Sequence, residues 1–268
     1  RKKTWDYEQV LLQNYQQYLK LLERTWDGGR TSNPANTLSV TAILSLCELL
    51  KSAPHFNFRS NILNLVVRQM NNHACQEVGD ACCEAVEYVF KTDAQGEFAL
   101  EAARLVAKVI KDRGFRVRAR VLRTFVALPL RVHLDEAQAA KLAAQANAKK
   151  RKRNREEAEI EAELKEGSGR IDKIILARSQ SDTLQAVTIT YFRILKSEDL
   201  TVAHIAELLP PALEGLAKFA HLINMDTVMD LLDVLKTLLK RVDELPPDAA
   251  FNCILTAFQT LQGPGREL

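Results

Sequence analysis

The chain has 268 residues, of which 47% are apolar and 26% charged, as in an ordinary folded protein with a buried core. Only 10 residues are glycine and 8 are proline, which disfavours an all-β protein because such a chain needs a turn every roughly 8–12 residues. The net charge of +3 is too small to indicate a nucleic-acid-binding protein by itself. No apolar run approaches the roughly 18 residues that cross a bilayer, so we expect no membrane span.

The N-terminus and the cysteines indicate the cellular context. The chain begins at Arg1 and not at Met, and no apolar stretch follows its basic start, so we expect a portion of a longer protein without a secretory signal. Five cysteines, with the vicinal pair Cys82–Cys83 among them, suit a reducing compartment. Cys75, this pair and His73 lack the tight spacing of structural zinc sites. We interpret the cysteines as buried side chains and expect neither metal nor cofactor.

The first part of the chain predicts a series of amphipathic helices. Leu11, Tyr15, Tyr18 and Leu22 lie on one face of a predicted helix at about residues 4–25. The sequence Asp27-Gly28-Gly29 is expected to end that helix. Further helices are predicted at about residues 34–52, 59–70, 74–91, 96–113 and 115–128, the last of them ended by a proline.

From about residue 134 to 165 the apolar pattern disappears. Alanine, glutamine, lysine, arginine and glutamate dominate there, and the basic run Lys149, Lys150, Arg151, Lys152, Arg153 and Arg155 precedes a series of glutamates. Helix-forming composition without an apolar stripe is typical of a helix that projects into solvent or lies on a partner. The sequence Gly167-Ser168-Gly169 is expected to break this helix.

The apolar period returns near residue 181. Helices are predicted at about residues 181–196, 202–209, 213–222, 226–242 and 248–261. Successive helices with short connections are antiparallel neighbours. The predicted fold is therefore all-α, an armadillo- or HEAT-like α-solenoid with a projecting charged helix. Its parts are residues 1–133, a charged excursion and linker at 134–179, and residues 180–268. Because no fixed-period repeat is visible, a degenerate solenoid and an irregular bundle both remain open.

The sequence contains no recognisable arrangement for catalysis. The glycine pairs lack the strand and the Lys-Ser/Thr of a phosphate-binding loop, and G-x-S-x-G is absent. The five histidines are scattered and show no metal-ligand spacing. We therefore predict a protein that is not an enzyme.

Two basic features are candidate binding sites. The run from Lys149 to Arg155 is a solvated helix face, a nuclear localisation signal or a contact for a phosphate backbone. Arg116, Arg120 and Arg123 lie at i, i+4 and i+7, so they share one face if the helix at 115–128 forms. That face fits bidentate phosphate contacts, or it is an exposed face paired with nearby acids.

Several strings, taken in order, resemble the nucleolar complex-associated protein 3 group of the Noc family of eukaryotic ribosome assembly factors. The strings are Asn14–Glu23, Cys47–Leu50, Ala53–Arg59, Gln95–Glu97 and Tyr191–Lys196. The resemblance extends from about residue 5 to 261 and is weakest at 142–179. It implies an armadillo-like fold in a nucleolar and nucleoplasmic protein that helps mature and export the large ribosomal subunit. It also implies a heterodimer with nucleolar complex protein 2, contacts with pre-ribosomal proteins and rRNA, and a further role in loading DNA replication factors. Members of the family extend well beyond both ends of this chain.

Two other functions remain open beside ribosome assembly. A chromatin-associated factor for the initiation of DNA replication would use the same kind of scaffold. A peptide-binding transport adaptor would need regular Trp and Asn ladders, whereas Trp5 and Trp26 are the only tryptophans. The sequence alone does not separate work on pre-ribosomes from work on chromatin.

Overall fold

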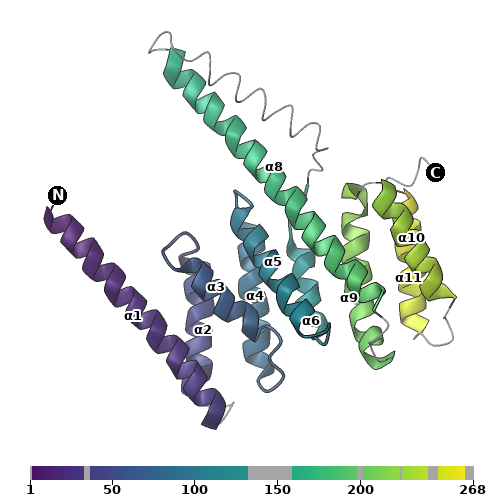
Figure 1. Cartoon of the computed structure of the whole chain (residues 1–268), viewed down its shortest axis with the longest axis horizontal. Helices are drawn as coiled ribbons and strands as arrows, with labels where there is room; N and C mark the ends of the chain where they lie inside the picture. Colours follow the sequence, from purple (N-terminus) through teal and green to yellow (C-terminus); the bar gives the residue numbers. More distant parts are fainter. Residues whose placement is uncertain are drawn as a thin grey trace.

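The computed structural model of the chain describes residues 2–32, 37–131, 159–197, 202–223, 225–240 and 247–262. These residues form ten α-helices and two 3₁₀ segments, and no strand occurs among them (Figure 1). The prediction of an all-α fold is confirmed for this part of the chain. In chain order the elements are α1 (Lys2–Ser32), α2 (Thr37–Ser52), α3 (Arg59–Gln69), α4 (Gln76–Thr92), α5 (Glu97–Asp112), α6 (Ala119–Arg123), η1 (Thr124–Ala127), α8 (Glu159–Leu195), α9 (Val202–Phe219), η2 (Ala220–Leu222), α10 (Met225–Leu239) and α11 (Pro247–Gln262).

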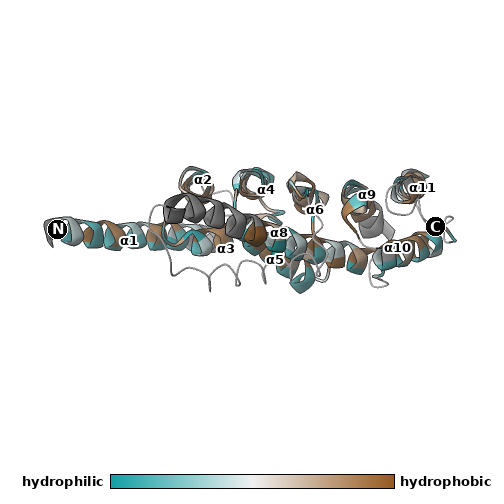
Figure 2. Ribbon diagram, turned by 90° about the horizontal axis from the view of Figure 1, so that it is seen from above, coloured by the Kyte–Doolittle hydropathy of each residue, from teal (hydrophilic) through white to brown (hydrophobic). Residues whose placement is uncertain are grey.

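The helices are arranged in two rows. Figure 2 shows α2, α4, α6, α9 and α11 in one row and α1, α3, α5, α8 and α10 in the other. Within the first row α2 packs on α4, α4 on α6, α6 on α9 and α9 on α11, and within the second α3 packs on α5 and α5 on α8. Helices that follow one another in the chain pack across the rows, as α1 does on α2 and α8 on α9. Each helix therefore contacts mainly the next helix along the chain and the next helix in its own row.

One hydrophobic core connects the two rows, from Leu19 of α1 to Cys253 of α11. Three buried aromatic rings lie near its middle. Phe90 of α4 stacks on Phe125 of η1 with ring centroids 6.4 Å apart, and Phe125 meets Tyr191 of α8 edge-on at 5.9 Å. Each such pair contributes about 0.5–1.5 kcal/mol beyond the burial of its area. Helices before residue 132 and helices after residue 158 therefore share one core.

The expected glycine breaks in two helices are wrong. Helix α1 continues through Gly28 and Gly29 to Ser32, and α8 passes through residues 167–169 without interruption. Each helical glycine costs about 1 kcal/mol relative to alanine, which a long helix with strong helix formers on both sides tolerates. Similarly, α9 passes through Pro210 and Pro211 as one helix where two segments were predicted. Packing of the buried residues on both sides of the prolines offsets the loss of two backbone donors.

Helix α8 is the longest helix of the described residues, with 37 residues. In Figure 1 it extends past the ends of its neighbours. Most of the projecting charged helix predicted at about residues 134–165 lies outside the described residues. The packed part of α8 lies beside α5 and points in the same direction. Arg104 of α5 forms an ion pair with Asp182 of α8 at 3.0 Å, and Gly96, just before α5, lies against Leu176 of α8. The C-terminal ends of α5 and α8 therefore lie on the same edge of the molecule.

Candidate binding surface: the arginines between α5 and α6

The predicted arginine face lies where α5 ends and α6 begins. Helix α5 closes with a tight turn in which the amide of Phe115 donates to the Ile110 carbonyl at 3.0 Å. Gly114 and Phe115 both have positive φ, 58° and 61°. The left-handed conformation costs a non-glycine residue about 1–2 kcal/mol. The Phe115 ring, which is half-buried and packed against the core, offsets that cost and fixes the turn.

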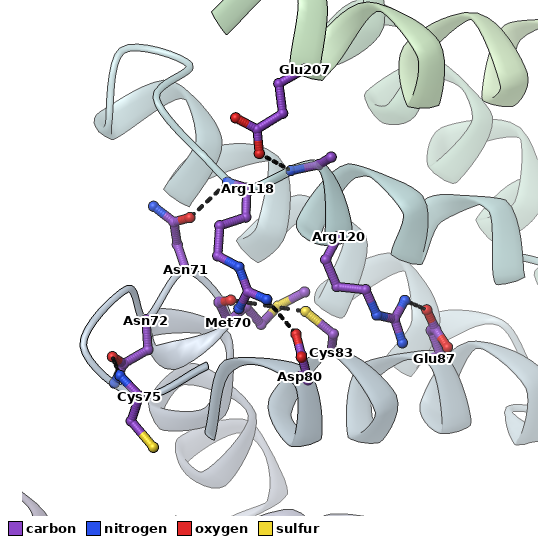
Figure 3. Close-up of polar contacts among 11 residues, drawn as sticks. Met70, Asn71, Asn72, Cys75, Asp80, Cys83, Glu87, Arg118, Arg120 and Glu207 are labelled. Atoms are coloured by element: carbon purple, nitrogen blue, oxygen red, sulfur yellow. Dashed lines mark hydrogen bonds and ion pairs between the residues drawn. The ribbon is translucent and has the colours of Figure 1, made fainter. Parts of the chain in front are cut away.

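A buried asparagine attaches this turn to the connection between α3 and α4. The Asn71 side chain donates from Nδ2 to the Arg116 carbonyl at 3.2 Å and accepts at Oδ1 from the Arg118 amide at 2.8 Å (Figure 3). Asn71 is only 3% exposed. Both polar ends of the asparagine are therefore satisfied, as a buried amide requires, and the backbone from residue 116 to 118 is held in one position.

The side chain of Arg118 lies largely buried and forms an ion pair within the structure. Its Nη2 donates to Asp80 of α4 at 2.5 Å, and the Arg118 side chain is only 14% exposed. In Figure 3 the guanidinium points down onto α4. Gly79 of α4 makes room for it, because a Cβ at that position would lie 2.4 Å from Arg118 Nη1 and 3.1 Å from the Met70 carbonyl. Arg118 is therefore an internal tie between α6 and α4.

The next two arginines also contact acids. Arg120 forms an ion pair with Glu87 of α4 (Figure 3), and this hydrogen bond raises the pKa of the Arg120 guanidinium above its already high value. Arg123 lies 3.9 Å from Glu214 of α9, with both side chains more than half exposed. A pair as exposed as the second one is worth at most about 1 kcal/mol.

Arg116, Arg120 and Arg123 consequently do not form one open face. The predicted helix at 115–128 is wrong at its start, because α6 begins only at Ala119 and Arg116 lies in the preceding turn. Phe115 in the left-handed region cannot begin a right-handed helix. Of the three, Arg116 is exposed and forms no ion pair with an acid of the described residues. Their role in binding stays a prediction. The run Lys149, Lys150, Arg151, Lys152, Arg153 and Arg155 lies outside the described residues.

The predicted Arg116 belongs to a second group of basic residues, in which Arg68 and Lys111 were missed by the sequence analysis. Arg113 Nη2 donates to the Arg68 carbonyl at 3.4 Å, so the C-terminal ends of α3 and α5 adjoin. Arg68 and Lys111 occupy the last turns of these helices. Arg68, Lys111, Arg113 and Arg116 all have exposed side chains, and no ion pair joins them to an acid of the described residues.

The same edge continues onto α8. Arg104 pairs with Asp182, and since both helices advance 1.5 Å per residue, Arg113 lies level with Tyr191. The exposed Arg193 and Lys196 follow within the next turns of α8 and just after it. We call these six residues the basic edge: Arg68, Lys111, Arg113, Arg116, Arg193 and Lys196. Basic residues are common at helix C-termini because the helix dipole favours them there. That signal applies to Arg68, Lys111 and Arg193 singly and says nothing of their convergence.

No protein-family model matches the chain, whereas individual relatives match nearly all of it. The nucleolar complex protein 3 homologue of Homo sapiens is 35% identical over 291 residues, which cover 98% of this chain. Nucleolar complex protein 3 of Drosophila melanogaster is 31% identical over 289 residues, which cover 100% of it. The chain belongs to the nucleolar complex protein 3 family. The resemblance found in the sequence is thereby confirmed.

The match extends to more distant members of the nucleolar complex protein 3 family. Nucleolar complex-associated protein 3 of Schizosaccharomyces pombe is 27% identical over 248 residues, which cover 87% of this chain. The chain spans about a third of the length of the curated relatives it matches, between 32% and 35% for these three. The region compared here is thus one part of what the relatives contain.

Beside the basic edge, the described residues of this family member form a groove, without a metal-ligand cluster or a membrane-spanning helix. No three His, Cys, Asp or Glu side chains there are grouped to hold a metal ion. None of the described helices combines the length and the apolar character needed to span a bilayer. A groove of about 390 Å³ lies between α1 and α2, lined by residues that include Tyr18, Leu44 and Glu48. Its one carboxylate, Glu48, is paired with Lys51 at 2.9 Å.

Proposed function

We propose that the chain is the helical-repeat part of a non-enzymatic scaffold that assembles the large ribosomal subunit in the nucleolus and nucleoplasm. The observation that carries this proposal is the 35% identity to the human nucleolar complex protein 3 homologue over 98% of the chain. The name of that relative places it in a nucleolar complex. Maturation and intranuclear transport of the subunit precursor are the roles that the resemblance implies.

The arrangement of the helices supports the scaffold part of the proposal. Packing of each helix on its neighbours in two rows is typical of armadillo- and HEAT-type α-solenoids, in which each repeat contacts the next. The two rows present long surfaces to partners. In the proposed organisation, residues 1–133 and 180–268 form the two parts of one solenoid, and residues 134–179 form the charged excursion between them.

One face of α11 supports a protein-binding role. Its inner face buries Ala250 and Cys253 against the core, while the opposite face is also apolar. The exposed residues of that face, which recur at helical spacing, are Phe251, Ile254, Leu255, Phe258 and Leu261. A helix that is apolar on both faces is normally covered on both. We assign this face to a partner Noc protein, nucleolar complex protein 2, which the resemblance implies.

The basic residues identified in the sequence support contact with pre-ribosomal RNA or proteins. Arg116, Arg120, Arg123 and the run from Lys149 to Arg155 are the proposed contacts, with nuclear import as a further role of the run. Arg116 is the best placed of the three single arginines, because Arg120 and Arg123 are occupied by Glu87 and Glu214.

Depletion of the full-length protein, followed by complementation, tests the proposal. We expect precursors of large-subunit rRNA to accumulate while small-subunit rRNA is processed normally, and we expect the tagged protein to co-purify with large-subunit precursors. Normal large-subunit processing after depletion would refute the assembly role. Recovery of replication-origin DNA in place of rRNA would assign the scaffold to chromatin.

A further inference from the structure

The basic edge gathers cations from three parallel helices and one turn. Arg68 lies in the last turn of α3 and Lys111 in the last turn of α5. Arg113 caps the C-terminus of α5, and Arg116 follows in the turn. With helix axes about 8–10 Å apart, the edge from α3 to Arg193 of α8 is roughly 20 Å long. In Figure 1 these three helices end on the same side of the molecule. The edge is therefore long enough to meet several charges of an extended ligand at once.

The composition of the edge fits an anionic ligand that is not a protein. No large apolar residue is exposed between residues 59 and 87 or between 89 and 131. Among the described side chains of α8 only Ile175 and Ile189 are exposed, the latter one turn before Arg193. A protein–protein interface carries an apolar and aromatic centre, whereas a nucleic-acid interface is more polar and strongly positive. The exposed carboxylates between residues 59 and 131 are Glu77, Glu84, Glu97 and Asp112. They are fewer than the exposed lysines and arginines of the same range, so positive charge predominates.

The turn that carries Arg113 and Arg116 is held rigidly. Asn71 bonds the Arg116 carbonyl and the Arg118 amide, and the half-buried Phe115 anchors the turn between the two exposed arginines. The ion pair of Arg118 with Asp80 adds a third tie. The backbone under the guanidinium groups is thus already ordered before a ligand binds, which lowers the entropic cost of binding.

We propose that the basic edge binds the phosphate backbone of RNA, through Arg68, Arg113 and Arg116 above all. The inference rests on the proposed function, from which it takes pre-ribosomal RNA as the ligand. Guanidinium groups make paired hydrogen bonds to phosphate oxygens. Such contacts carry no sequence information, so the edge positions an RNA strand and does not select it.

The test compares two variants of the full-length protein that lose the same charge. The first is Arg68→Gln with Arg113→Gln and Arg116→Gln. The control is Lys20→Gln with Lys91→Gln and Arg178→Gln, at exposed positions away from the edge. Both should melt within about 2 °C of the parent, as surface substitutions do. Binding to a 20-nucleotide oligouridine is then measured as a function of salt concentration.

For single strands, each phosphate contact contributes about 0.7 to the slope of log K against log salt. Loss of three contacts should therefore make the slope shallower by about 2 and weaken binding on the order of 10-fold or more near physiological salt. The control should keep the parental slope. Equal losses in both variants, or an unchanged slope in the first, would overturn the proposal. So would equally tight binding of polyglutamate through the same three residues, since the ligand would then be an acidic protein segment.

The RNA-binding role of the basic edge and the proposed role in ribosome assembly can be refuted independently. If the full-length protein co-purifies with large-subunit precursors but the triple variant binds RNA as the parent does, the assembly role stands and the RNA-binding edge is wrong. If no precursor co-purifies while oligouridine binding still depends on the three arginines, the edge stands and the assembly role is wrong.

Discussion

Replacement of Arg118 by methionine tests whether the Arg118 side chain stabilises the fold, in contrast to an exposed arginine that is free to bind a ligand. Methionine keeps most of the length of the side chain but removes its charge and its bond to Asp80. The Arg118 side chain is 14% exposed and that of Asp80 is 37% exposed. Exposed ion pairs are worth about 0–1 kcal/mol, and breaking a fully buried pair costs about 3–5 kcal/mol. For this partly buried pair we expect a loss of about 1–2 kcal/mol.

In a chain of this size that loss lowers the melting temperature by about 2–8 °C. Circular dichroism at the helical minimum measures the melting temperature, and hydrogen exchange of the amides near residues 71–80 locates the loosened region. Arg116→Met is the matched control, because the Arg116 side chain is exposed and the backbone bond to Asn71 is kept. The control should stay within about 0.5 kcal/mol of the parent. Equal losses in both variants would refute the assignment of Arg118 as an internal tie.

Gly79→Ala provides an independent check on the same contact. The added Cβ would lie 2.4 Å from Arg118 Nη1, so it should destabilise the parent although alanine is the better helix former. In the Arg118→Met background the cost should be smaller, because the nearest clashing atom is gone. An identical cost in both backgrounds would show that Arg118 does not lie against α4.

Three further outcomes are expected. Leu235→Asp should unfold the C-terminal helices, seen as a loss of cooperative melting, because Leu235 is 1% exposed and an unpaired buried charge costs several kcal/mol; unchanged melting would contradict the packing of α10. Iodoacetamide at pH 8 should modify Cys75 before Cys83, because Cys75 is partly exposed. Burial raises the pKa of Cys83 to about 12, so almost none of this thiol is in the reactive thiolate form. Mass spectrometry measures the order of modification, and the reverse order would contradict the burial of Cys83. Glutamine at the four basic positions 150–153 should change stability by no more than about 0.5 kcal/mol yet reduce nuclear accumulation, and normal accumulation would favour the solvated-face interpretation.

Much of the fold follows from the spacing of apolar residues. The stripe of Phe98, Ala102, Leu105 and Val109 predicts α5. The structure buries Phe98 and Ala102, leaves Leu105 and Val109 half-buried, and turns the neighbouring Val106 and Ile110 into the core instead. The helix ends were harder to predict, because residues 167–169 and Gly28 are local signals that the surrounding helix overrides. A glycine weakens a helix by a fixed small amount, and only the rest of the fold decides whether the helix continues.

The candidate site was less predictable than the fold. Asn71, Asp80 and Glu87 engage arginines that are 33–47 residues away in the sequence. The spacing of arginines therefore does not reveal which of them are already occupied. The convergence of Arg68 with Arg113 depends on the parallel packing of α3 and α5, which no local pattern encodes. The signal present in the sequence was the basic residue in the last turn of each helix.

The most direct test of the central claim is to map protein–RNA crosslinks on large-subunit precursors purified with the full-length protein. Ultraviolet crosslinking and identification of the RNA-modified peptides by mass spectrometry would locate the contact. The account predicts crosslinked peptides that contain residues 68–73 and 111–118, carrying large-subunit precursor rRNA. Precursor particles that yield crosslinks in the rest of this chain, with those two segments unmodified, would contradict it.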